Sequence, residues 1–335
     1  MLRVCVIGAG SWGTALALLL HRNGNRVQLW ARRSGHVSTM RETRRNEHYL
    51  PGQLLPTAIA ITDEIDQALE GAELVVVSVP SHAFSAAVEM LGGVKAPIVL
   101  ATKGFELETG RLLHEVAVDK LGKGISIGVL SGPSFANEVA KNLPGAVTLA
   151  ANEIAEAKRF AAIFRSDYFR VYISNDLVGV QIGGGVKNVL ALATGISDGL
   201  GFGANTRAAL ITRGLAELSR LGAAVGARHE TLIGLSGLGD LVLTCTDDRS
   251  RNRRAGLILG KGGDIELAKR DIGQVVEGIT AVKEVIRMAR KYGVEMPICE
   301  QVEQVVQVVQ VAHRVQAIAA AGAGVIVAAR ENHPD

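Results

Sequence analysis

The sequence predicts an α/β fold in which a mostly parallel sheet domain precedes an all-helical domain. Two observations carry this prediction. Short apolar runs typical of buried strands alternate with segments of helical periodicity as far as residue 174. After Ser174 the strand-like runs end, and only helical patterns follow. We therefore predict one domain over residues 1–174 and a second over residues 175–335.

The first domain begins with a strand–helix–strand unit. Leu2–Ile7 is typical of a strand buried on both faces, Trp12–Arg22 has helical periodicity, and Arg26–Trp30 is a second strand. Such a unit implies a parallel sheet. Further strands are predicted at 73–79, 97–101, 125–130, 146–150 and 169–173, with helices at 82–91 and 153–164. In the second domain, helices are predicted at 177–196, 204–221, 229–235, 253–259 and 280–292, and the irregular stretch 300–316 is compatible with an amphipathic helix.

The composition is that of a globular protein rich in Gly, Ala and Val, with a formal net charge of +3. The basic residues form no long run, so we expect no nucleic-acid partner. Cys5, Cys245 and Cys299 have no CxxC spacing and the histidines have no ligand spacing, so we expect reduced thiols and no metal site. The apolar runs fall short of the roughly 20 residues of a spanning helix, and no signal peptide is evident. We expect a soluble, cytoplasmic protein.

A glycine-rich motif joins the first strand to the first helix. In Gly8-Ala-Gly-Ser-Trp-Gly13, Gly8 permits a tight turn, Gly10 lets the backbone approach a pyrophosphate, and Gly13 lets the helix pack on the strand. The helix N-terminus favours the negative charge of a phosphate. An ordinary strand–helix turn is the alternative. The position of the motif favours a Rossmann-type, dinucleotide-binding domain.

The second predicted strand ends without the acidic residue that reads the ribose 2′-hydroxyl of NAD. Arg32 and Arg33 stand there instead, where a 2′-phosphate would lie. They favour NADP as cofactor, or at least tolerance of NADP beside NAD. The alternative is a solvated pair of arginines.

A single lysine, Lys187, lies inside the apolar, glycine-rich helical run Val178–Ile196. Burying its charge is costly unless the lysine has a function. We interpret it as the residue against which a nicotinamide is placed, in a cleft between the two domains. This placement is the spatial hypothesis on which the other interpretations depend.

Further polar patches interrupt apolar surroundings. They are Lys103 at a strand end, the segment Ser131-Gly-Pro-Ser-Phe-Ala136, Asp240 within Gly237–Thr246, and Ser250-Arg-Asn-Arg-Arg254 at a helix start. Together they supply a cation, a carboxylate and a seat for phosphate. Each has a plainer alternative: a surface lysine, a helix cap at Asp240, a turn at Gly237 and Gly239, and a solvated helix face. His82 follows a strand end and either touches the cofactor or belongs to a helix cap.

Several motifs carry a family resemblance. They are Gly8–Ala15, Ala101–Gly104, Ser131–Ala136, Val186–Val189, Gly195–Gly203, Ala209–Glu217, Gly237–Thr246, Ser250–Arg254 and Val275–Gly278. Together they closely resemble the bacterial NAD(P)-dependent sn-glycerol-3-phosphate dehydrogenases, from about residue 2 to residue 300. The resemblance implies reduction of dihydroxyacetone phosphate to sn-glycerol 3-phosphate for phospholipid synthesis by a homodimer.

The resemblance also implies roles for individual residues. Lys187 corresponds to the catalytic acid and base, with Asp240 beside it. Substrate contacts are implied for Lys103, Gly132, Ser134, Lys187, Asp240, Ser250, Arg251 and Asn252, and we count Asn188 and Thr244 of the same motifs with them. Cofactor contacts are expected for Gly8, Gly10, Ser11, Trp12, Gly13, Arg32, Arg33, Lys103, Ala136 and Arg251, with Val275 and Glu277 closing the adenosine side.

The chain departs from the family pattern in two places. Gly185 stands where the family commonly has Ala, which is expected to loosen the helix by about 0.5–1 kcal/mol. The tail from about Gln301 does not follow the family's usual ending. Two other functions compete with the one implied: a related two-domain dehydrogenase of 3-hydroxy acids, and a protein that senses NAD(P)H without chemistry.

Overall fold

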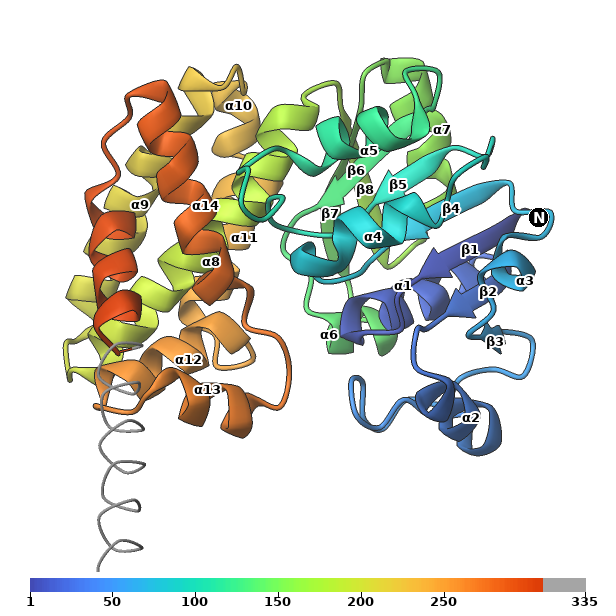
Figure 1. Cartoon of the computed structure of the whole chain (residues 1–335), viewed down its shortest axis with the longest axis horizontal. Coiled ribbons are helices and arrows are strands. Elements are labelled where there is room, and N and C mark those ends of the chain that lie inside the picture. The colour runs from blue at the N-terminus through green and yellow to red at the C-terminus, as the bar shows by residue number, and fades with distance from the viewer. Residues whose placement is uncertain (310–335) are drawn as a thin grey trace, which may run out of the picture.

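The computed structural model describes residues 1–309 and has two lobes, a sheet lobe and a helical lobe (Figure 1). The sheet has eight strands in the order β3-β2-β1-β4-β5-β6-β7-β8. The strands are β1 Arg3–Ile7, β2 Arg26–Trp30, β3 Ala60–Thr62, β4 Leu74–Val77, β5 Ile98–Leu100, β6 Ile127–Ser131, β7 Gly145–Ala151 and β8 Phe169–Ser174. All neighbours pair in parallel except β6 and β7. The predicted α/β fold with a mostly parallel sheet is therefore confirmed.

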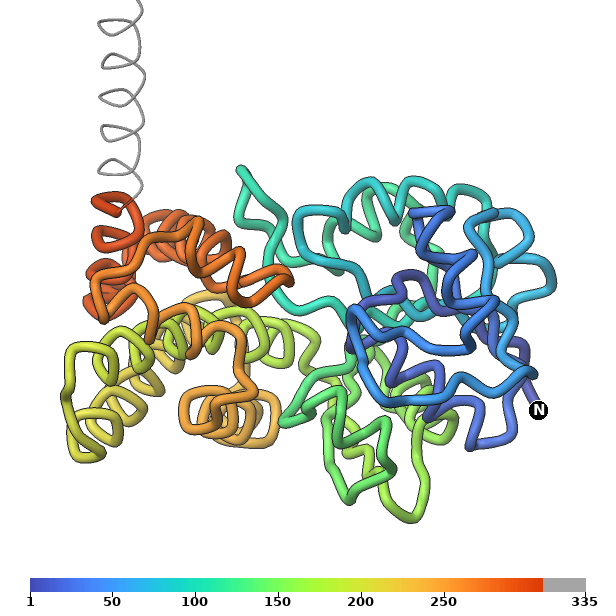
Figure 2. Tube along the Cα trace, turned by 90° about the horizontal axis from the view of Figure 1, so that it is seen from below, coloured from blue at the N-terminus to red at the C-terminus, as the bar shows by residue number. Residues whose placement is uncertain are grey.

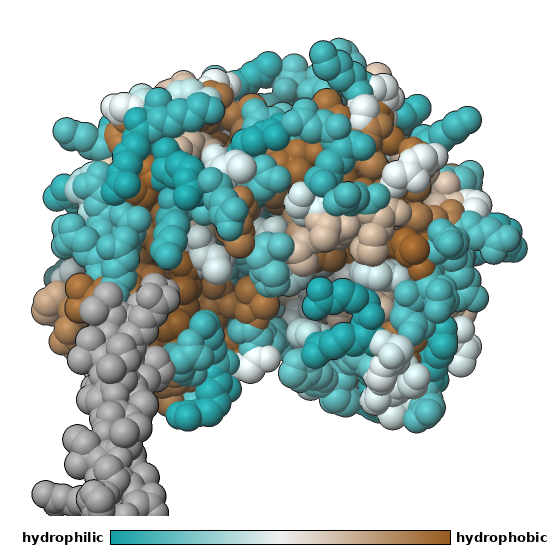
Figure 3. Space-filling model, viewed as in Figure 1, coloured by the Kyte–Doolittle hydropathy of each residue, from teal (hydrophilic) through white to brown (hydrophobic). Residues whose placement is uncertain are grey.

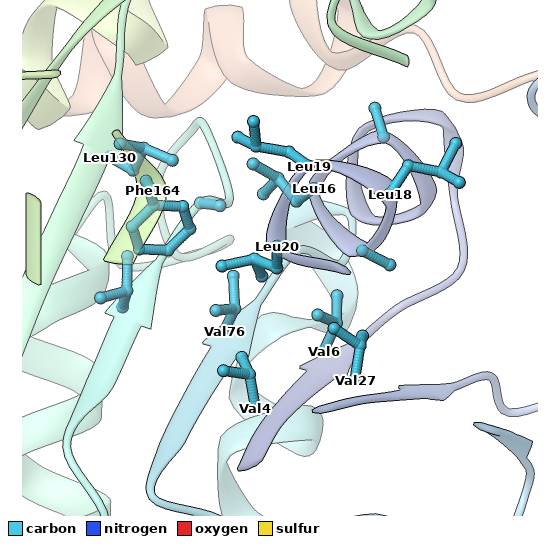
Figure 4. Packing of buried hydrophobic residues seen from close by; sticks show 14 of the residues in the cluster. Val4, Val6, Leu16, Leu18, Leu19, Leu20, Val27, Val76, Leu130 and Phe164 are labelled. Atoms are coloured by element: carbon cyan, nitrogen blue, oxygen red, sulfur yellow. The ribbon is translucent and has the colours of Figure 1, made fainter. Parts of the chain in front are cut away.

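Helices cover the sheet on both faces. They are α1 Ser11–Arg22, α2 Ser34–Thr43, α3 Ile65–Leu69, η1 Ser81–Ala83, α4 Phe84–Glu89, α5 Leu113–Leu121, α6 Ala136–Ala140 and α7 Ile154–Phe164. In α1 the spacing of Leu16, Leu19 and Leu20 places three side chains on one face. Figure 4 shows them beside Phe164 and Val76, in one buried cluster. This packing fixes the N-terminus of α1 at the carboxyl end of β1.

The helical lobe is built around α8 Leu177–Gly199. Around it lie α9 Ala204–Ala224, α10 His229–Leu232, η2 Leu235–Gly239, α11 Asp240–Thr246, α12 Arg251–Gly260, α13 Ile265–Ile272, α14 Glu277–Tyr292 and helical residues 297–309. By length and composition α8 could cross a membrane, but 94% of its most apolar stretch is buried inside the protein. It is thus placed as a core helix. On the face in Figure 3, apolar surface gathers on the lower half of this lobe.

Glycines bring α8 and α12 into close contact. A Cβ atom on Gly195 would lie 2.1 Å from the Arg253 carbonyl oxygen and 2.9 Å from Gly256 Cα. Because backbone rather than a flexible side chain fills this space, no side chain fits at Gly195. The two helix axes are therefore held in one relative position.

The lobes are also joined by the loop that follows β5. The backbone N–H of Glu108 donates to Glu284 of α14 at 3.1 Å, and Figures 1 and 2 both show this loop reaching across to the helical lobe. The loop contains Lys103 and Phe105, whose side chains lie close to Gly184 and Gly185 of α8. It therefore places the end of β5 against α8. β8 ends at Ser174 and α8 begins at Leu177, and we retain residue 174 as the proposed domain boundary.

The predicted strands and the main predicted helices are present, with ends that differ by a few residues. Elements that the sequence did not predict are β3, α2, α3, α5, α6, η2, α11 and α13. The alternative of a turn at Gly237 and Gly239 is wrong, because both residues lie in η2. The predicted helix at 300–316 is confirmed as far as residue 309; residues 310–316 lie outside the described residues.

Candidate active site

The glycine motif forms a turn that a dinucleotide fits. A Cβ atom on Gly13 would lie 1.8 Å from the Gly8 carbonyl oxygen, and one on Gly8, whose φ is +109°, 2.5 Å from that of Ser78. Around Gly10, by contrast, the space is open. Only glycine therefore allows the close packing at Gly8 and Gly13, while Gly10 leaves room for a pyrophosphate at the N-terminus of α1.

The end of β2 carries a second cationic site. Arg32 and Arg33 are exposed and line an open hollow of about 500 Å³ together with Ser34, Gly35, His36 and His48. Arg33 Nη2 donates to the Tyr49 hydroxyl at 2.5 Å. The hollow lies at the start of α2, and the two guanidinium groups that line it suit a phosphate dianion.

Lys187 is the centre of a buried polar cluster. Its Nζ donates to Asp240 Oδ1 at 2.8 Å and to Thr244 Oγ1 at 2.8 Å. The side chain of Lys187 is 9% exposed and that of Asp240 is 1% exposed. Asp240 is the first residue of α11, but its carboxylate binds lysines; it does not cap the helix. The clustering of Lys187, Asp240 and Thr244 was expected from the sequence.

Lys103 reaches the same carboxylate from the other lobe. Its Nζ donates to Asp240 Oδ2 at 2.7 Å and to the Gly132 carbonyl oxygen at 3.0 Å. It is therefore not a free surface lysine. One carboxylate shared by two ammonium groups leaves a net positive charge at the lobe interface, which suits an anionic substrate.

Burial sets the acidity of Lys187. The pKa of Lys187 is lowered from 10.5 to about 8, mainly by desolvation, with a further contribution from the charge of Lys103. Asp240 acts in the opposite direction, because its negative charge favours the ammonium form. At neutral pH the ammonium form predominates, but it gives up its proton far more readily than an exposed lysine.

The residues predicted to hold the phosphate lie at the start of α12. Asn252 Nδ2 donates to Asn188 Oδ1 at 2.9 Å, and the Gly278 N–H donates to Asn252 Oδ1 at 2.8 Å. The amide of Asn252 thus links α12, α8 and α14. Ser250 is the N-cap of α12 and accepts from the Arg253 N–H at 3.2 Å. Arg251 follows with an exposed side chain.

The segment after β6 lies beside this cluster. Gly132 has a φ of +147°, and a Cβ atom there would lie 2.9 Å from Val147 Cα. Ser134 Oγ donates to the Gly132 carbonyl oxygen at 3.0 Å, and Ala136 begins α6. The segment therefore turns tightly at the edge of the Lys103 site.

Gln274 is a residue at the site that the sequence did not reveal. Its Oε1 accepts from Arg251 Nη1 at 3.2 Å and lies 3.1 Å from Ser11 Oγ, whose single hydrogen is shared with the closer Tyr49 carbonyl oxygen. It thus joins the glycine turn of one lobe to Arg251, at the start of α12, in the other. The only sequence signal was its position directly before Val275, where the segment Val275–Gly278 of the resemblance begins.

Glu277 makes a second tie between the lobes. It accepts from Ser81 Oγ at 2.6 Å and from the Ser81 N–H at 3.2 Å. Ser81 follows β4, so Glu277 lies near the glycine turn, with half-buried Val275 just before it. His82 lies in η1 with an exposed side chain.

The structure therefore brings most of the expected residues to the junction of the lobes. Lys103, Lys187, Asp240 and Thr244 form one cluster. Ser11, Gln274 and Arg251 form another, while Arg32 and Arg33 form a separate site at the end of β2. Trp12 keeps a buried Nε1 with no partner among the described residues. Open space at Gly10, unpaired donors and two cationic sites fit a dinucleotide.

Comparison with known proteins gives consistent matches. Family models of NAD-dependent glycerol-3-phosphate dehydrogenase match residues 3–157 with the N-terminal part and residues 176–323 with the C-terminal part. Glycerol-3-phosphate dehydrogenase (NAD(P)+) from Nitrosococcus oceani is 56% identical over 304 residues, which cover 90% of this chain and 88% of that protein. The protein of this name from Pseudoalteromonas translucida is 51% identical over 303 residues, 89% of this chain and 90% of that protein. The crystal structure of glycerol-3-phosphate dehydrogenase from Coxiella burnetii matches with a TM-score of 0.88 and 46% identity, over 91% of this chain and 94% of that one.

Proposed function

The chain belongs to the NAD-dependent glycerol-3-phosphate dehydrogenase family, and from this we propose that it interconverts dihydroxyacetone phosphate and sn-glycerol 3-phosphate with NAD(P)H. One observation carries the assignment of the catalytic group. Lys187 is a buried ammonium on the helical lobe, 2.8 Å from Asp240, whose other carboxylate oxygen binds Lys103 of the sheet lobe. A buried charge with a lowered pKa beside a nucleotide site is typical of a general acid.

The proposed mechanism uses one proton and one hydride. A nicotinamide cofactor held on the glycine turn would supply a hydride for the carbonyl carbon. As the carbon–hydrogen bond forms, the π electrons of the carbonyl move to oxygen, and Lys187 Nζ donates a proton to that oxygen. The product is the secondary alcohol and a neutral amine, which regains a proton from solvent. In the oxidation direction the neutral amine accepts the alcohol proton.

Asp240 and Lys103 position Lys187 and adjust its acidity. Asp240 orients the Lys187 ammonium through a 2.8 Å bond, and Lys103 holds the other carboxylate oxygen at 2.7 Å. Because Lys103 shares the carboxylate, Asp240 does not bind the Lys187 proton so tightly that its transfer is prevented. Thr244 Oγ1 accepts a second hydrogen bond from the Lys187 ammonium and so further restricts its orientation.

The phosphate is proposed to bind at the N-terminus of α12. Arg251 supplies a guanidinium there, and Asn252 supplies an amide held by two bonds to other helices. Holding the phosphate fixes the carbonyl by orientation, which is a large part of the rate gain expected in such reactions. Ser250 mainly orders this helix start, since its hydroxyl already caps α12.

Arg32 and Arg33 support a preference for NADP over NAD. Both lie at the end of β2, where the adenosine ribose of a dinucleotide on the glycine turn is expected. The hollow that they line has the size and charge for a 2′-phosphate. Among the described residues, those that line the hollow include no acidic side chain to hold a free 2′-hydroxyl.

The test compares Lys187→Met with the wild-type enzyme. We expect NADPH oxidation with dihydroxyacetone phosphate to fall by at least about 100-fold, because the proton donor is lost. The NADPH dissociation constant, measured by fluorescence, should change less than about threefold. Lys95→Met, at an exposed lysine at the opposite end of the sheet, should leave both unchanged. Near-normal turnover in Lys187→Met would remove this residue from the mechanism.

The wild-type enzyme also tests the competing function. If it reacts faster with 3-hydroxyisobutyrate and NADP than with dihydroxyacetone phosphate and NADPH, it is a hydroxy acid dehydrogenase.

Three further parts of the proposal rest on the family alone. We propose that the enzyme acts in the cytoplasm, supplies glycerol phosphate for phospholipid synthesis and is a homodimer. Light scattering coupled to size exclusion tests the last point. A mass of one chain at micromolar concentration would reject the dimer.

A further inference from the structure

The segment between α2 and β3 contacts the glycine turn through a buried amide. Asn46 is 1% exposed, and its Nδ2 donates to the Ala9 carbonyl oxygen at 2.9 Å and to Thr14 Oγ1 at 2.8 Å. The Asn46 Oδ1 is buried and has no partner among the described residues. A buried amide with an unpaired oxygen is costly, so its two donated bonds matter to the turn.

The bond to Ala9 determines where a neighbouring donor points. In a trans peptide the carbonyl oxygen and the following N–H point in opposite directions. Because Asn46 holds the Ala9 oxygen, the Gly10 N–H is directed away from Asn46. In residues 1–309 no group accepts this N–H, and the space around Gly10 is open. Asn46 therefore orients a donor of the turn that receives the pyrophosphate.

Tyr49 lies three residues after Asn46 in the same segment and makes two contacts of its own. Its carbonyl oxygen accepts from Ser11 Oγ at 2.6 Å, and its hydroxyl accepts from Arg33 Nη2 at 2.5 Å. One residue thus orders both the first residue of α1 and one arginine of the hollow. The Leu50 N–H donates to the main-chain carbonyl oxygen of Asn46 at 2.7 Å. The turn that this bond closes keeps Asn46 and Tyr49 in a fixed relation.

We propose that Asn46 and Tyr49 are positioning residues of the cofactor site, in which Asn46 orients the glycine turn and Tyr49 orients Arg33. The Asn46 role concerns the part common to NADH and NADPH. The Tyr49 role rests on the proposed function, because it requires that Arg33 binds the 2′-phosphate. The two residues therefore affect cofactor binding in different ways, and that difference can be measured.

The experiment measures dissociation constants for NADH and NADPH by quenching of tryptophan fluorescence, the KM for dihydroxyacetone phosphate, and the melting temperature. Asn46→Ala should weaken both cofactors about tenfold, with the KM for the ketone within about twofold. Tyr49→Phe should weaken NADPH about three- to tenfold and leave NADH unchanged. Glu47→Gln is the matched control in the same segment. Among the described residues, the Glu47 carboxylate bonds to Arg45 and to the Gly52 N–H, and to neither the glycine turn nor Arg33. It should change the dissociation constant of neither cofactor.

A merely structural role is separated by Thr14→Val. This substitution removes one bond of Asn46 but leaves the bond to Ala9, so cofactor dissociation constants should stay within about twofold even if the melting temperature falls. Unchanged cofactor binding in Asn46→Ala, or equal weakening by Thr14→Val, would overturn the role of Asn46. If Asn46→Ala does not fold, Asn46→Ser provides the same comparison, with weakening of both cofactors expected and unchanged binding overturning the role.

Arg33→Ala separates this inference from the proposed function. If Arg33→Ala leaves the NADPH to NADH ratio unchanged, the 2′-phosphate assignment itself fails. If Arg33→Ala changes the ratio and Tyr49→Phe does not, the assignment stands and the positioning role of Tyr49 is wrong.

Discussion

At the scale of single residues, Lys187 shows how burial and a partner charge combine. Burial lowers its pKa to about 8, although Asp240 lies 2.8 Å away and opposes the shift. Without Asp240 the pKa of the Lys187 amine would be lower still, so less of it would be protonated and able to act as an acid in ketone reduction. Without burial it would hold its proton too firmly to give it up.

This pKa predicts opposite pH dependences for the two directions. Reduction needs the protonated lysine, whose fraction falls as pH rises through about 8. Between pH 7 and pH 9, kcat/KM for dihydroxyacetone phosphate should fall about tenfold, and that for glycerol 3-phosphate should rise similarly. Initial rates in both directions measure this. Parallel profiles in the two directions would exclude Lys187 as the titrating group.

Arg32 and Arg33 make cofactor choice a residue-scale property. Arg32→Ala/Arg33→Ala should raise the KM for NADPH at least about tenfold and leave that for NADH within about twofold, because a charge-assisted bond to the 2′-phosphate is lost. Steady-state kinetics with each cofactor provide the measurement. The exposed Arg26→Ala, at the opposite end of β2, is the control. Equal effects on both cofactors would assign the arginines a role other than 2′-phosphate recognition.

The residues that were predictable from sequence share one property. Lys187, Asp240 and Lys103 are charged residues in apolar surroundings, and such residues stand out in a sequence. Gln274 and Asn46 are neutral amides in loops, where an uncharged polar side chain does not stand out. Their importance arises from contacts with Ser11 and Ala9, which are distant in sequence, and no local pattern encodes those contacts.

At the scale of elements, the length and clarity of the hydrophobic pattern decided which helices and strands could be predicted. The buried strands β1 and β4 are continuous apolar runs. β3 has three residues, which is too short for any pattern. α2 contains Gly35 and several Ser and Thr residues, which disfavour helix in isolation. It forms because Val37 and Met40 are buried against the lobe.

Gly185 has a physical reason that sequence alone could not supply. A Cβ atom there would lie 2.6 Å from the ring of Phe105. The glycine therefore makes room for an aromatic side chain of the loop after β5. The expected loosening of α8 is offset by this packing against the loop that carries Lys103.

This contact predicts a non-additive pair of substitutions. Gly185→Ala gains about 0.5–1 kcal/mol of helix propensity but overpacks Phe105 by about 1–3 kcal/mol, so net stability should fall. Phe105→Leu in the same chain should recover most of the loss, because the smaller side chain admits the methyl group. Thermal melting of the two single variants and the double variant measures this coupling. Additive changes would mean that the two positions do not press on each other.

At the scale of the whole molecule, the contacts between lobes were the least predictable feature. The change from alternating strands to helices showed where the second lobe begins. Bonds such as Ser81 to Glu277 and Glu108 to Glu284 join residues separated by 196 and 176 positions. These bonds depend on how the completed lobes meet, which periodicity does not specify.

His114 makes one interlobe contact sensitive to pH. Gln181 Nε2 can only donate, so the His114 Nδ1 at 2.7 Å accepts and the ring is neutral. Burial lowers the pKa of His114 below 6.5, while Glu115 and Gln181 oppose the shift. The folded state therefore binds fewer protons than the unfolded state at mildly acidic pH, and this contribution to stability is lost as pH falls below 6.5.

We accordingly expect the melting temperature to fall less between pH 7 and pH 5 in His114→Asn than in the wild type. The exposed His229→Asn serves as the control and should follow the wild-type curve. An identical decrease in all three proteins would assign the acid sensitivity to other groups.

The glycine contact between α8 and α12 has a consequence for which substrates can react. Lys187 lies on α8 and Arg251 begins α12, while Gly195 and Gly256 press the two backbones together. The distance from Lys187, the proposed proton donor, to the proposed phosphate site at Arg251 is therefore set by main-chain atoms, which yield far less than side chains do. The contact between α8 and α12 therefore limits how long a substrate can be and still react. A phosphorylated ketone one carbon longer can bind at the proposed phosphate site, but its carbonyl oxygen will lie out of reach of the Lys187 ammonium.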